Sequence, residues 1–305
     1  MKPAQYVGRF APSPTGPLHF GSLLAAMSSY CDARSHNGLW FLRVDDIDPP
    51  RTVPGASEGI ERTLKAYGFS WDGPVRKQSE RSKHYLNKLT KLNELKMLFP
   101  CACSRSRLAK HSPYPGYCNP VSASSVSTTG DAAVKVRKKL KSGDKDHAIR
   151  IIIDTDVWFE DRIQGQQIFS DGQPGDTIVM RRDDLFAYTL ACAVDDADGI
   201  SHVVRGSDLL PTTAGQIAVI KHLGLEPPVY AHIPVAVNVE QQKLSKQTHA
   251  QALDTMQPLP TLLLAWQFLG QREINVATVD AFWQEAISLW ELASVPRQSQ
   301  LDTPA

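Results

Sequence analysis

Residues 6–46 read YVGRFAPSPTGPLHFGSLLAAMSSYCDARSHNGLWFLRVDD, and this stretch decides the fold class. A short apolar strand over residues 6–10 runs into a turn rich in proline and glycine, APSPTGP. A helical stretch of small residues follows over 19–33, and a second strand covers 39–46. The order strand, turn, helix, strand opens a parallel sheet with helices on its faces. We therefore expect an α/β protein with a Rossmann-type, doubly wound parallel sheet.

The rest of the chain alternates between helix and strand patterns. Helical patterns cover residues 54–68, 81–98, 209–223, 259–269 and 279–292. Strand patterns cover residues 149–154, 158–180, LFAYTLACAVDD at 185–196, HVVR at 202–205 and IPVAV at 233–237. A loop rich in serine and threonine, expected to be mobile, covers residues 121–130. We predict four segments: a catalytic domain in two halves (1–98 and 181–257), an α+β insertion (99–180) and a short helical C-terminal tail (258–305).

Composition limits the class of protein. The chain has 305 residues, of which 42% are hydrophobic and 21% charged, as expected of a globular chain with a full core. Its 33 basic and 32 acidic residues leave a net charge of +1, which argues against a sequence-indifferent nucleic-acid coat protein. No apolar run approaches the roughly 20 residues of a membrane span, and the start lacks the apolar core of a signal peptide. We expect a cytoplasmic monomer that does not bind membranes.

Two separated motifs are suited to a nucleotide. Residues 17–22 (PLHFGS) lie where the first strand meets the first helix, and a helix N-terminus favours phosphate. His19 can donate a hydrogen bond to phosphate and Gly21 leaves room for an adenine ring, the alternative being a helix-capping turn with an incidental histidine. Residues 243–247 (KLSKQ) place two lysines around a serine in a loop, where they can neutralise a pyrophosphate leaving group. Alone, residues 243–247 would be interpreted as a solvated surface loop. Together with residues 17–22 they favour a nucleotide-binding site.

Both motifs resemble those of class I aminoacyl-tRNA synthetases of the glutamyl type. GRFAPSPTGPLHFG (8–21) resembles the HIGH-type signature, and KLSKQ resembles the KMSKS-type loop. FLRVDDIDPPR (41–51) and DLFAYTLACAVDDADGISHVVRGSDLL (184–210) resemble the strand and the amino-acid-binding segment between them. The resemblance implies activation of L-glutamate by ATP, with Mg²⁺ accompanying the ATP. It implies catalytic roles for His19, Lys243 and Lys246, and an ATP site made of His19, Gly21, Ser22, Lys243, Ser245 and Lys246.

The resemblance also implies how glutamate is held. Arg9 and Arg205 pair with carboxylate, which suits planar guanidinium groups, and a structural ion pair is the alternative for each. Asp45 holds the ammonium group, Tyr188 hydrogen-bonds the substrate from the end of its strand, and Ser13 lies in the turn whose backbone reaches the amino acid. The family usually has glutamate where this chain has Asp45, which keeps the charge but shortens its reach by one methylene. Three further acidic residues hold ribose, order the site or form a solvated strand end: Asp195, Asp196 and Asp198.

Five cysteines occur in the chain, and Cys101, Cys103 and Cys118 fall close together. In a reducing compartment such a cluster suggests a metal, and three thiolates suit a structural, tetrahedral Zn²⁺ with one further ligand. The residues alone leave four candidates for that ligand: Tyr114, Tyr117, water and His111, the last being the first choice on chemistry. Resemblance to the short relatives of glutamyl-tRNA synthetase favours Tyr114. The alternative of three free surface thiols is disfavoured because exposed thiols are reactive.

Chain length bears on which molecule accepts the glutamate. Only residues 248–305 follow the KLSKQ loop, too few for the helical region that reads the anticodon in a discriminating glutamyl-tRNA synthetase. HFGS, KLSKQ and the C-x-C…Y-x-x-x-C arrangement resemble a short branch of the family, which implies transfer to the queuosine base in the anticodon of tRNA(Asp). The alternatives are a truncated glutamyl-tRNA synthetase that charges a tRNA 3′ end and a non-catalytic tRNA-binding module. We expect activation without tRNA.

Basic residues in the predicted insertion are candidates for contacts with the tRNA backbone. Phosphates attract lysine and arginine whatever the base sequence. The alternative is a solvated charged face. The candidates are Arg105, Arg107, Lys110 and the basic run 135–141.

Overall fold

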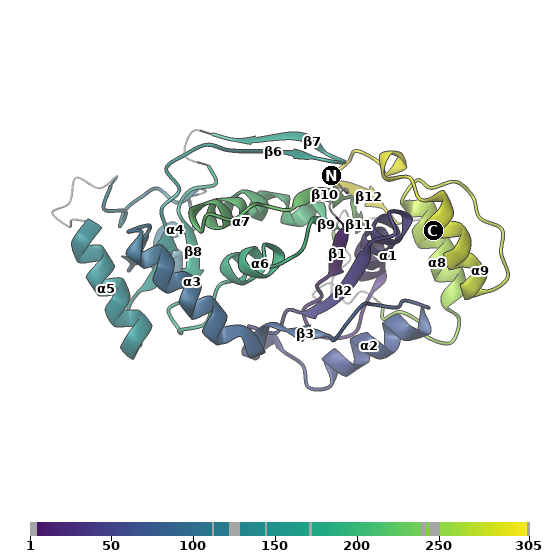
Figure 1. Cartoon of the computed structure of the whole chain (residues 1–305), viewed down its shortest axis with the longest axis horizontal. Helices are drawn as coiled ribbons and strands as arrows, with labels where there is room; N and C mark the ends of the chain where they lie inside the picture. The colour runs from purple at the N-terminus through teal and green to yellow at the C-terminus, as the bar shows by residue number, and fades with distance from the viewer. Residues whose placement is uncertain are drawn as a thin grey trace.

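A parallel sheet forms the centre of the molecule, as the opening stretch predicts (Figure 1). The computed structural model describes residues 5–111, 113–121, 129–143, 145–170, 173–238, 242–243 and 251–303. Strand β1 (Val7–Phe10) pairs in parallel with β2 (Leu39–Val44), which pairs in parallel with β3 (Arg76–Lys77). The turn after β1 and the helix after that turn therefore begin at the carboxyl edge of the sheet.

The second half of the sheet joins the first beside β1. Ser201 N donates to the carbonyl of Val7 at 3.0 Å, which places β9 (His202–Gly206) next to β1. Strand β9 pairs in parallel with β10 (Val229–Ile233) over five residue pairs. The two halves of the predicted Rossmann sheet thus lie side by side, although they are far apart in the sequence.

Helix α1 (Phe20–Ser35) covers one face of this sheet, and two C-terminal helices pack against α1. These are α8 (Pro258–Phe268) and α9 (Val279–Leu289), whose Trp266 and Phe282 are almost completely buried in the main core. The chain ends in a short strand, β12 (Gln300–Asp302), parallel to β11 (Val235–Val237). The two helices predicted in this segment are therefore present, and they pack into the main core together with the short strand β12 that the sequence did not predict.

The remaining helices gather around a second hydrophobic cluster. It is formed by the antiparallel sheet described next, by Val136 of the helix that packs with that sheet, and by buried side chains of three further helices. The helices concerned are α3 (Ser82–Glu94), α6 (Tyr188–Asp196) and α7 (Leu210–His222). A further helix, α2 (Ala56–Ala66), lies beneath the parallel sheet in Figure 1.

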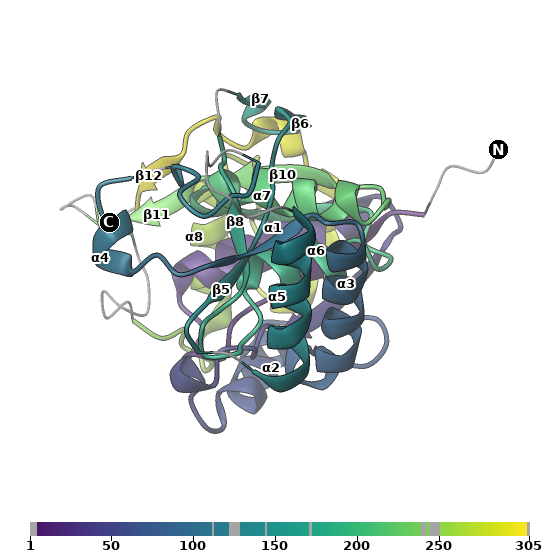
Figure 2. The ribbon, with the colours of Figure 1, turned by 90° about the vertical axis from the view of Figure 1, so that its left-hand side faces the viewer.

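The segment predicted as an insertion forms a separate antiparallel sheet. Its strands are β4 (Leu98–Cys101), β5 (Ala148–Ile151) and β8 (Thr177–Met180), in the order β4-β5-β8. Helix α5 (Thr129–Ser142) packs beside α3 (Figure 2), and α4 (Arg105–Leu108) is a single turn. The hairpin of β6 (Val157–Asp161) and β7 (Gly165–Phe169) returns to the central sheet, where Asp161 pairs with Tyr230 of β10.

Residues 122–128 of the expected mobile loop lie outside the described residues, and Thr129 already begins α5. Lys139, within the basic run, is buried and its ammonium lies 2.7 Å from the carboxylate of Asp184, so this lysine is wrong as a phosphate contact. A lysine on the inner face of an amphipathic helix pairs with a carboxylate because an unpaired buried charge is costly.

The prediction of a strand over LFAYTLACAVDD is wrong. Ala187 N still bonds in sheet fashion to the carbonyl of Val179 at 3.0 Å, but α6 begins at Tyr188. All residues from Leu190 to Asp196 are buried, so no exposed polar face marks this segment of the sequence as a helix. A short apolar run of this kind does not distinguish a buried strand from a buried helix.

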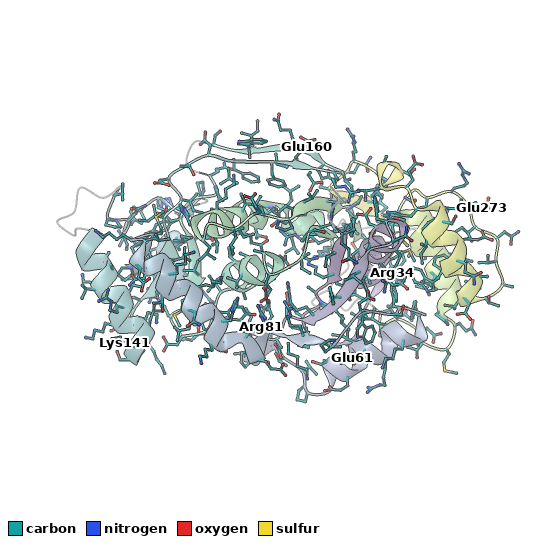
Figure 3. The ribbon with its side chains drawn as sticks, in the orientation of Figure 1. Arg34, Glu61, Arg81, Lys141, Glu160 and Glu273 are labelled. Atoms are coloured by element: carbon teal, nitrogen blue, oxygen red, sulfur yellow. The ribbon has the colours of Figure 1, made fainter. Side chains whose placement is uncertain are left out.

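Charged side chains project from the outside of the molecule, with Lys141 and Glu273 at opposite ends (Figure 3). Over the part of the chain that the structure describes, no helix is both long enough and apolar enough to pass through a bilayer.

Candidate active site

A cavity of about 700 Å³ opens at the carboxyl ends of β1, β9 and β10. This edge is where parallel α/β sheets bind their ligands. The first cavity is lined by the turn after β1, the start of α1, the start of α6 and the segments that follow β9 and β10. It brings together eight of the residues predicted from sequence: Arg9, Ser13, His19, Gly21, Ser22, Tyr188, Arg205 and Lys243.

The two predicted nucleotide motifs meet at this cavity. His19 is the N-cap of α1, and it forms an antiparallel bridge with Ala252, just beyond the lysine loop. Lys243, at the start of that loop, bridges to Val237 of β11, and its Nζ lies 2.5 Å from a carboxylate oxygen of Asp208. The loop therefore leaves from and returns to the cavity wall, while Ser245 and Lys246 themselves lie outside the described residues.

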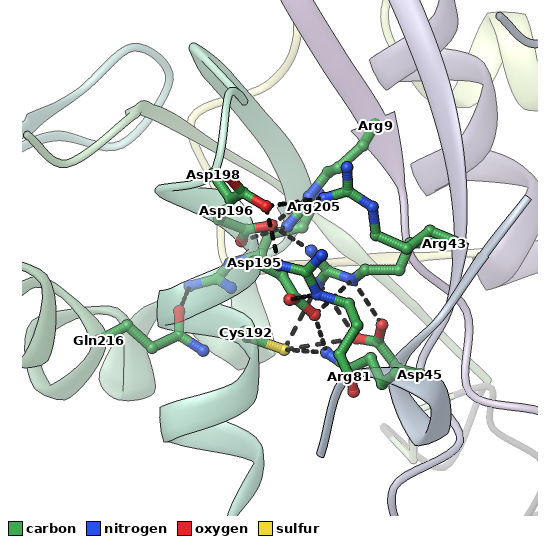
Figure 4. A network of polar contacts seen from close by, with 12 residues as sticks. Arg9, Arg43, Asp45, Arg81, Cys192, Asp195, Asp196, Asp198, Arg205 and Gln216 are labelled. Atoms are coloured by element: carbon green, nitrogen blue, oxygen red, sulfur yellow. Dashed lines mark hydrogen bonds and ion pairs between the residues drawn. The ribbon is translucent and has the colours of Figure 1, made fainter. Parts of the chain in front are cut away.

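Arg205 is held in place from three sides. Its Nη2 donates to Thr213 Oγ1 at 2.7 Å and to Gln216 Oε1 at 2.8 Å, and its Nε donates to His232 Nε2 at 3.1 Å. Figure 4 shows Arg205 beside Gln216. The remaining nitrogen, Nη1, is buried and has no hydrogen-bond partner among the described residues. An arginine fixed in this way keeps one donor for a group that enters the cavity.

His232 accepts from Arg205 because Asp161 fixes its tautomer. Its Nδ1 lies 2.5 Å from Asp161 Oδ2, so Nδ1 carries the proton and Nε2 carries a lone pair. Burial lowers the pKa of His232, although Asp161 opposes the shift, and the ring is therefore neutral. Gln216 Nε2 and Tyr230 OH are two further buried polar atoms with no partner in the described part of the chain. Of these three atoms, only Arg205 Nη1 belongs to a residue that lines the first cavity, where a guanidinium suits a carboxylate.

Arg9 forms a buried ion pair, the alternative that the sequence left open. Its Nε and Nη2 each lie 3.1 Å from an oxygen of Asp196, whose Oδ1 also accepts from Arg43 Nη1 at 2.6 Å. Figure 4 shows the two arginines converging on this carboxylate. Burial alone would raise the pKa of Asp196, but Arg9 and Arg43 outweigh it and hold the pKa well below its usual range. Asp196 is thus an ionised anchor that orders the site.

Asp45 is also committed to a neighbour. Its Oδ1 accepts from Arg43 Nε at 2.6 Å, and its Oδ2 lies 3.3 Å from the thiol of Cys192. Burial, followed by the Asp45 charge, raises the pKa of Cys192, so the thiol keeps its proton and donates it to Asp45. Asp45 lines a second cavity of about 430 Å³, which adjoins the first.

The other two acidic residues of this region are not a solvated strand end. Asp195 is fully buried at the end of α6, where its carboxylate accepts from Gln78, Tyr85 and Arg81 at 2.7–2.8 Å. Asp198 is about half exposed and pairs with Arg81 at 2.7 Å. Both residues therefore fasten the site to the segment that precedes α3.

The cysteine cluster is formed by the last residue of β4 and two residues that follow β4. The sulfur atoms of Cys101, Cys103 and Cys118 lie within 4.8 Å of one another. The hydroxyl of Tyr114 lies 3.6 Å from Cys101 Sγ, whereas His111 is hydrogen-bonded to Tyr117 at 3.0 Å. Tetrahedral zinc with Zn–S bonds near 2.3 Å places its sulfurs about 3.8 Å apart, so these donors fit the ion.

Sequence reasoning missed four residues that hold cavity-lining side chains in place. Arg43 stands two positions before Asp45, the spacing that puts strand residues on one face, and this signal was available. The others carry no local signal, because each acts through a partner distant in the sequence. They are Asp161, His232 and Gln216.

Comparison with known proteins now places the chain. The family described as "tRNA synthetases class I (E and Q), catalytic domain" matches residues 5–266. The glutamyl-Q tRNA(Asp) synthetase of Aromatoleum aromaticum is 43% identical over 98% of this chain and 93% of that protein, and the one of Dechloromonas aromatica is 44% identical over 98% and 99%. The solved glutamate-tRNA synthetase of Elizabethkingia anophelis has a TM-score of 0.79 at 23% identity, covers 99% of this chain and 68% of that one, and shows the shared fold. The chain therefore belongs to the glutamyl-Q tRNA(Asp) synthetase family, within the class I tRNA synthetases.

Proposed function

We propose that this chain activates L-glutamate with ATP and transfers the glutamate to the queuosine base in the anticodon of tRNA(Asp). One observation carries the proposal: His19 at a helix N-terminus, Lys243 of the lysine loop and the anchored Arg205 line one cavity of about 700 Å³. That cavity joins a phosphate-binding end to a carboxylate-binding end. The names of relatives 41–44% identical over nearly the whole chain support queuosine in tRNA(Asp) as the acceptor.

Glutamate is oriented by its charged ends. Arg205 Nη1 receives one carboxylate. Arg9 lines the same cavity, and its ion pair with Asp196 keeps its guanidinium in place. Tyr188 and Ser13 border both cavities and Asp45 lines the second, so we assign the ammonium group to the junction of the two cavities.

ATP takes the end of the first cavity near α1. Phosphates face the N-terminus of α1 at His19, Gly21 and Ser22, and Lys243 lines the same cavity. Ser245 and Lys246 of the lysine motif complete the proposed ATP site. The substrate carboxylate attacks the α-phosphorus in line, and the bond to pyrophosphate breaks with Mg²⁺ and the lysines balancing its charge. No covalent enzyme intermediate is required, because positioning and charge stabilisation supply the catalysis.

Transfer with radiolabelled glutamate tests this function directly. Purified protein is incubated with ATP and tRNA(Asp) that contains or lacks queuosine. We expect label only on the queuosine form, and label that survives removal of the tRNA 3′ end. Label on the 3′ adenosine of either tRNA would instead identify a truncated glutamyl-tRNA synthetase.

Asp161→Asn should weaken glutamate binding. Asp161 Oδ1 accepts from three backbone N–H groups, so asparagine would place its oxygen there and its amide NH₂ at His232 Nδ1. Nδ1 then accepts, Nε2 carries the proton, and Nε2 no longer accepts from Arg205. We expect the KM for glutamate to rise about tenfold, the equivalent of one hydrogen bond of about 1–1.5 kcal/mol, while the KM for ATP stays unchanged. Pyrophosphate exchange measures both constants, and nitrogen NMR shifts of His232 report the tautomer.

Asp32→Asn is the matched control for this variant. Asp32 is also a buried carboxylate, bound by Arg162 and Tyr6 in the core, but it does not line the first cavity. The Asp32→Asn substitution should lower the thermal stability and leave the KM for glutamate unchanged. Equal KM changes in both variants would contradict a role for Asp161 in positioning Arg205.

We further propose that Cys101, Cys103, Cys118 and Tyr114 hold a structural Zn²⁺. The loop that carries them is bound to the antiparallel sheet: Asn119 Nδ2 donates to Asp176 at 2.7 Å, and Arg182 Nη2 donates to the carbonyl of Cys103 at 3.0 Å. When bound, the ion cross-links this loop, as structural zinc does in small loop-rich segments. Arg150, whose guanidinium lies 3.9 Å from the centre of the Tyr114 ring, offsets part of the negative charge of this ligand set.

Removal of the metal should separate the two half-reactions. Freshly purified protein is expected to contain one zinc per chain by elemental analysis. Chelation should lower the thermal stability and reduce glutamate transfer at least about tenfold, since small displacements of reacting groups cost that much, while pyrophosphate exchange continues. Cys31→Ala, which alters a buried core cysteine, should retain the zinc. Protein purified without any zinc would refute the site.

A further inference from the structure

The thiol of Cys192 lies beside the glutamate site, but the proposed function gives it no task. Cys192 is almost completely buried on α6, one helical turn after Tyr188. Residues four apart lie on the same face of a helix, so Cys192 and Tyr188 face the same side. The sulfur therefore lies within the group of side chains that surrounds Asp45 (Figure 4).

The hydrogen bonds of Asp45 leave one of its two oxygens partly available. Arg43 Nε donates to Oδ1 at 2.6 Å and Arg43 Nη2 donates to Oδ2 at 3.2 Å. The Cys192 thiol also donates to Oδ2, at 3.3 Å. A carboxylate oxygen accepts about two hydrogen bonds. Oδ2 is therefore filled by its two donors, whereas Oδ1 has one donor among the described residues and can accept another.

The direction of the thiol proton is set by two donors that point at the sulfur. Arg43 Nη2 lies 3.6 Å from Cys192 Sγ, and Gln78 Nε2 lies 3.9 Å from it. Gln78 Nε2 also donates to Asp195 at 2.8 Å, which keeps the amide in place. Because both donors approach the sulfur, its own proton is directed at the remaining neighbour, which is Asp45.

A buried cysteine otherwise serves as a small apolar core residue. Cys31 is of that kind, because it is completely buried among the apolar side chains of the main core. The residues on either side of Cys192, Ala191 and Ala193, belong to the second hydrophobic cluster. Cys192 itself belongs to none of the four apolar clusters found in the described part of the chain. Its surroundings are polar, and its contacts are hydrogen bonds.

We propose that Cys192 is a positioning residue for the ammonium group of glutamate: its thiol occupies Oδ2 of Asp45 and leaves Oδ1 to accept from the substrate. This assignment rests on the proposed function, which places the ammonium group at Asp45. The short acid at position 45 and the thiol at position 192 then act as a pair, in which a donor from α6 holds a carboxylate carried by the segment after β2.

Replacement of Cys192 by alanine and by serine separates a hydrogen-bond donor from a space-filling side chain. Cys192→Ala should raise the Kd and the KM for glutamate about fivefold, as expected for one hydrogen bond, and leave kcat and the KM for ATP within about twofold. Cys192→Ser keeps a donor and should remain within about twofold in all four constants. Calorimetry with glutamate gives the Kd, and pyrophosphate exchange gives the others.

The matched control uses the same two substitutions at Cys31. In that apolar surrounding a serine buries a hydroxyl group at a cost, so Cys31→Ser should lower the thermal stability more than Cys31→Ala. Neither variant should change the Kd for glutamate by more than about twofold. The preference for serine over alanine is therefore expected at Cys192 alone.

Asp45→Glu tests whether positions 45 and 192 act as a pair. The added methylene moves the carboxylate by up to about 1.5 Å, and Cys192 Sγ already lies 3.3 Å from Oδ2. We expect Asp45→Glu to raise the Kd for glutamate about tenfold. The double variant with Cys192→Ala gives the longer acid room and should bind within about threefold of the unmodified chain, so the two effects are not additive.

Infrared spectroscopy reports the hydrogen bond of the thiol without any reaction. The S–H stretching band that disappears in Cys192→Ala should move to higher wavenumber in Asp45→Asn, because an amide accepts a weaker hydrogen bond than a carboxylate. If the chain forms no adenylate, the proposed function fails, and this band and the Kd values still decide on Cys192. An unchanged Kd in Cys192→Ala, an equal loss in Cys192→Ser, or additive effects in the double variant overturns the proposal.

Discussion

Arg205→Lys should lower kcat/KM for glutamate in pyrophosphate exchange about 1000-fold. Three contacts fix the guanidinium and leave Nη1 for the substrate. A single ammonium cannot satisfy Thr213 and Gln216 and also reach a carboxylate, because lysine lacks the planar fork of donors. Leaving a buried carboxylate without its partner costs about 2–5 kcal/mol, which corresponds to roughly 30-fold to several thousand-fold.

The control for this variant is Arg162→Lys. Arg162 also pairs with a buried carboxylate, that of Asp32, but it does not line the first cavity. Its replacement should change the stability and leave kcat/KM for glutamate within about twofold. If Arg205→Lys raised the KM for ATP and spared that for glutamate, the carboxylate-binding end of the cavity would have been assigned wrongly.

Lys243→Ala should reduce the kcat of pyrophosphate exchange about 100-fold with little change in the KM for glutamate. The ammonium lies at the cavity wall, held 2.5 Å from Asp208, where it meets charge that develops on the leaving pyrophosphate. Removal of one preorganised group of this kind typically costs 100- to 1000-fold in kcat. Lys246→Ala, in the same motif, should behave alike.

Lys221→Ala provides the comparison for the lysine variants. Lys221 is exposed near the end of α7 and does not line the first cavity. Its kinetics should match those of the unmodified chain. Unchanged exchange in both Lys243→Ala and Lys246→Ala would sink the assignment of the lysine loop to the leaving group.

The sequence was sufficient for those features that local spacing encodes. The strand, turn and helix of residues 6–33 and the HFGS and KLSKQ motifs predicted which segments would meet, and the first cavity does unite His19 with Lys243. Tyr188 also lies at the cavity, but as the first residue of a helix, because an apolar run carries no period that separates helix from strand.

Long-range pairing was beyond prediction from one sequence. Asp161 and His232 are 71 residues apart, and only the register of β6 against β10 brings them together to hold Arg205. The ion pair of Arg9 with Asp196 likewise joins positions 187 apart. Nothing in either local sequence distinguishes these carboxylates from the solvated ones that are common in loops.

The shortened acid at position 45 has a structural counterpart. Asp45 lies between the guanidinium of Arg43 and the thiol of Cys192, so its smaller reach is accompanied by two neighbours that hold it. In the sequence, Arg43 was visible two residues away, but the thiol comes from α6, 147 positions later. The fold therefore explains how the shorter Asp45 is held in place, which the sequence of the strand alone does not show.

The parallel pairing of β12 with β11 has a consequence for synthesis. Val235 N bonds to the carbonyl of Ser299, and β11 leads directly to Lys243. A growing chain exposes β11 before its partner exists, and at about 5–20 residues per second the wait for β12 lasts several seconds. During that time the strand that anchors the lysine loop has an open edge, the kind that pairs with other chains. The edge of β11 is thus protected only after residues 300–302 have left the ribosome.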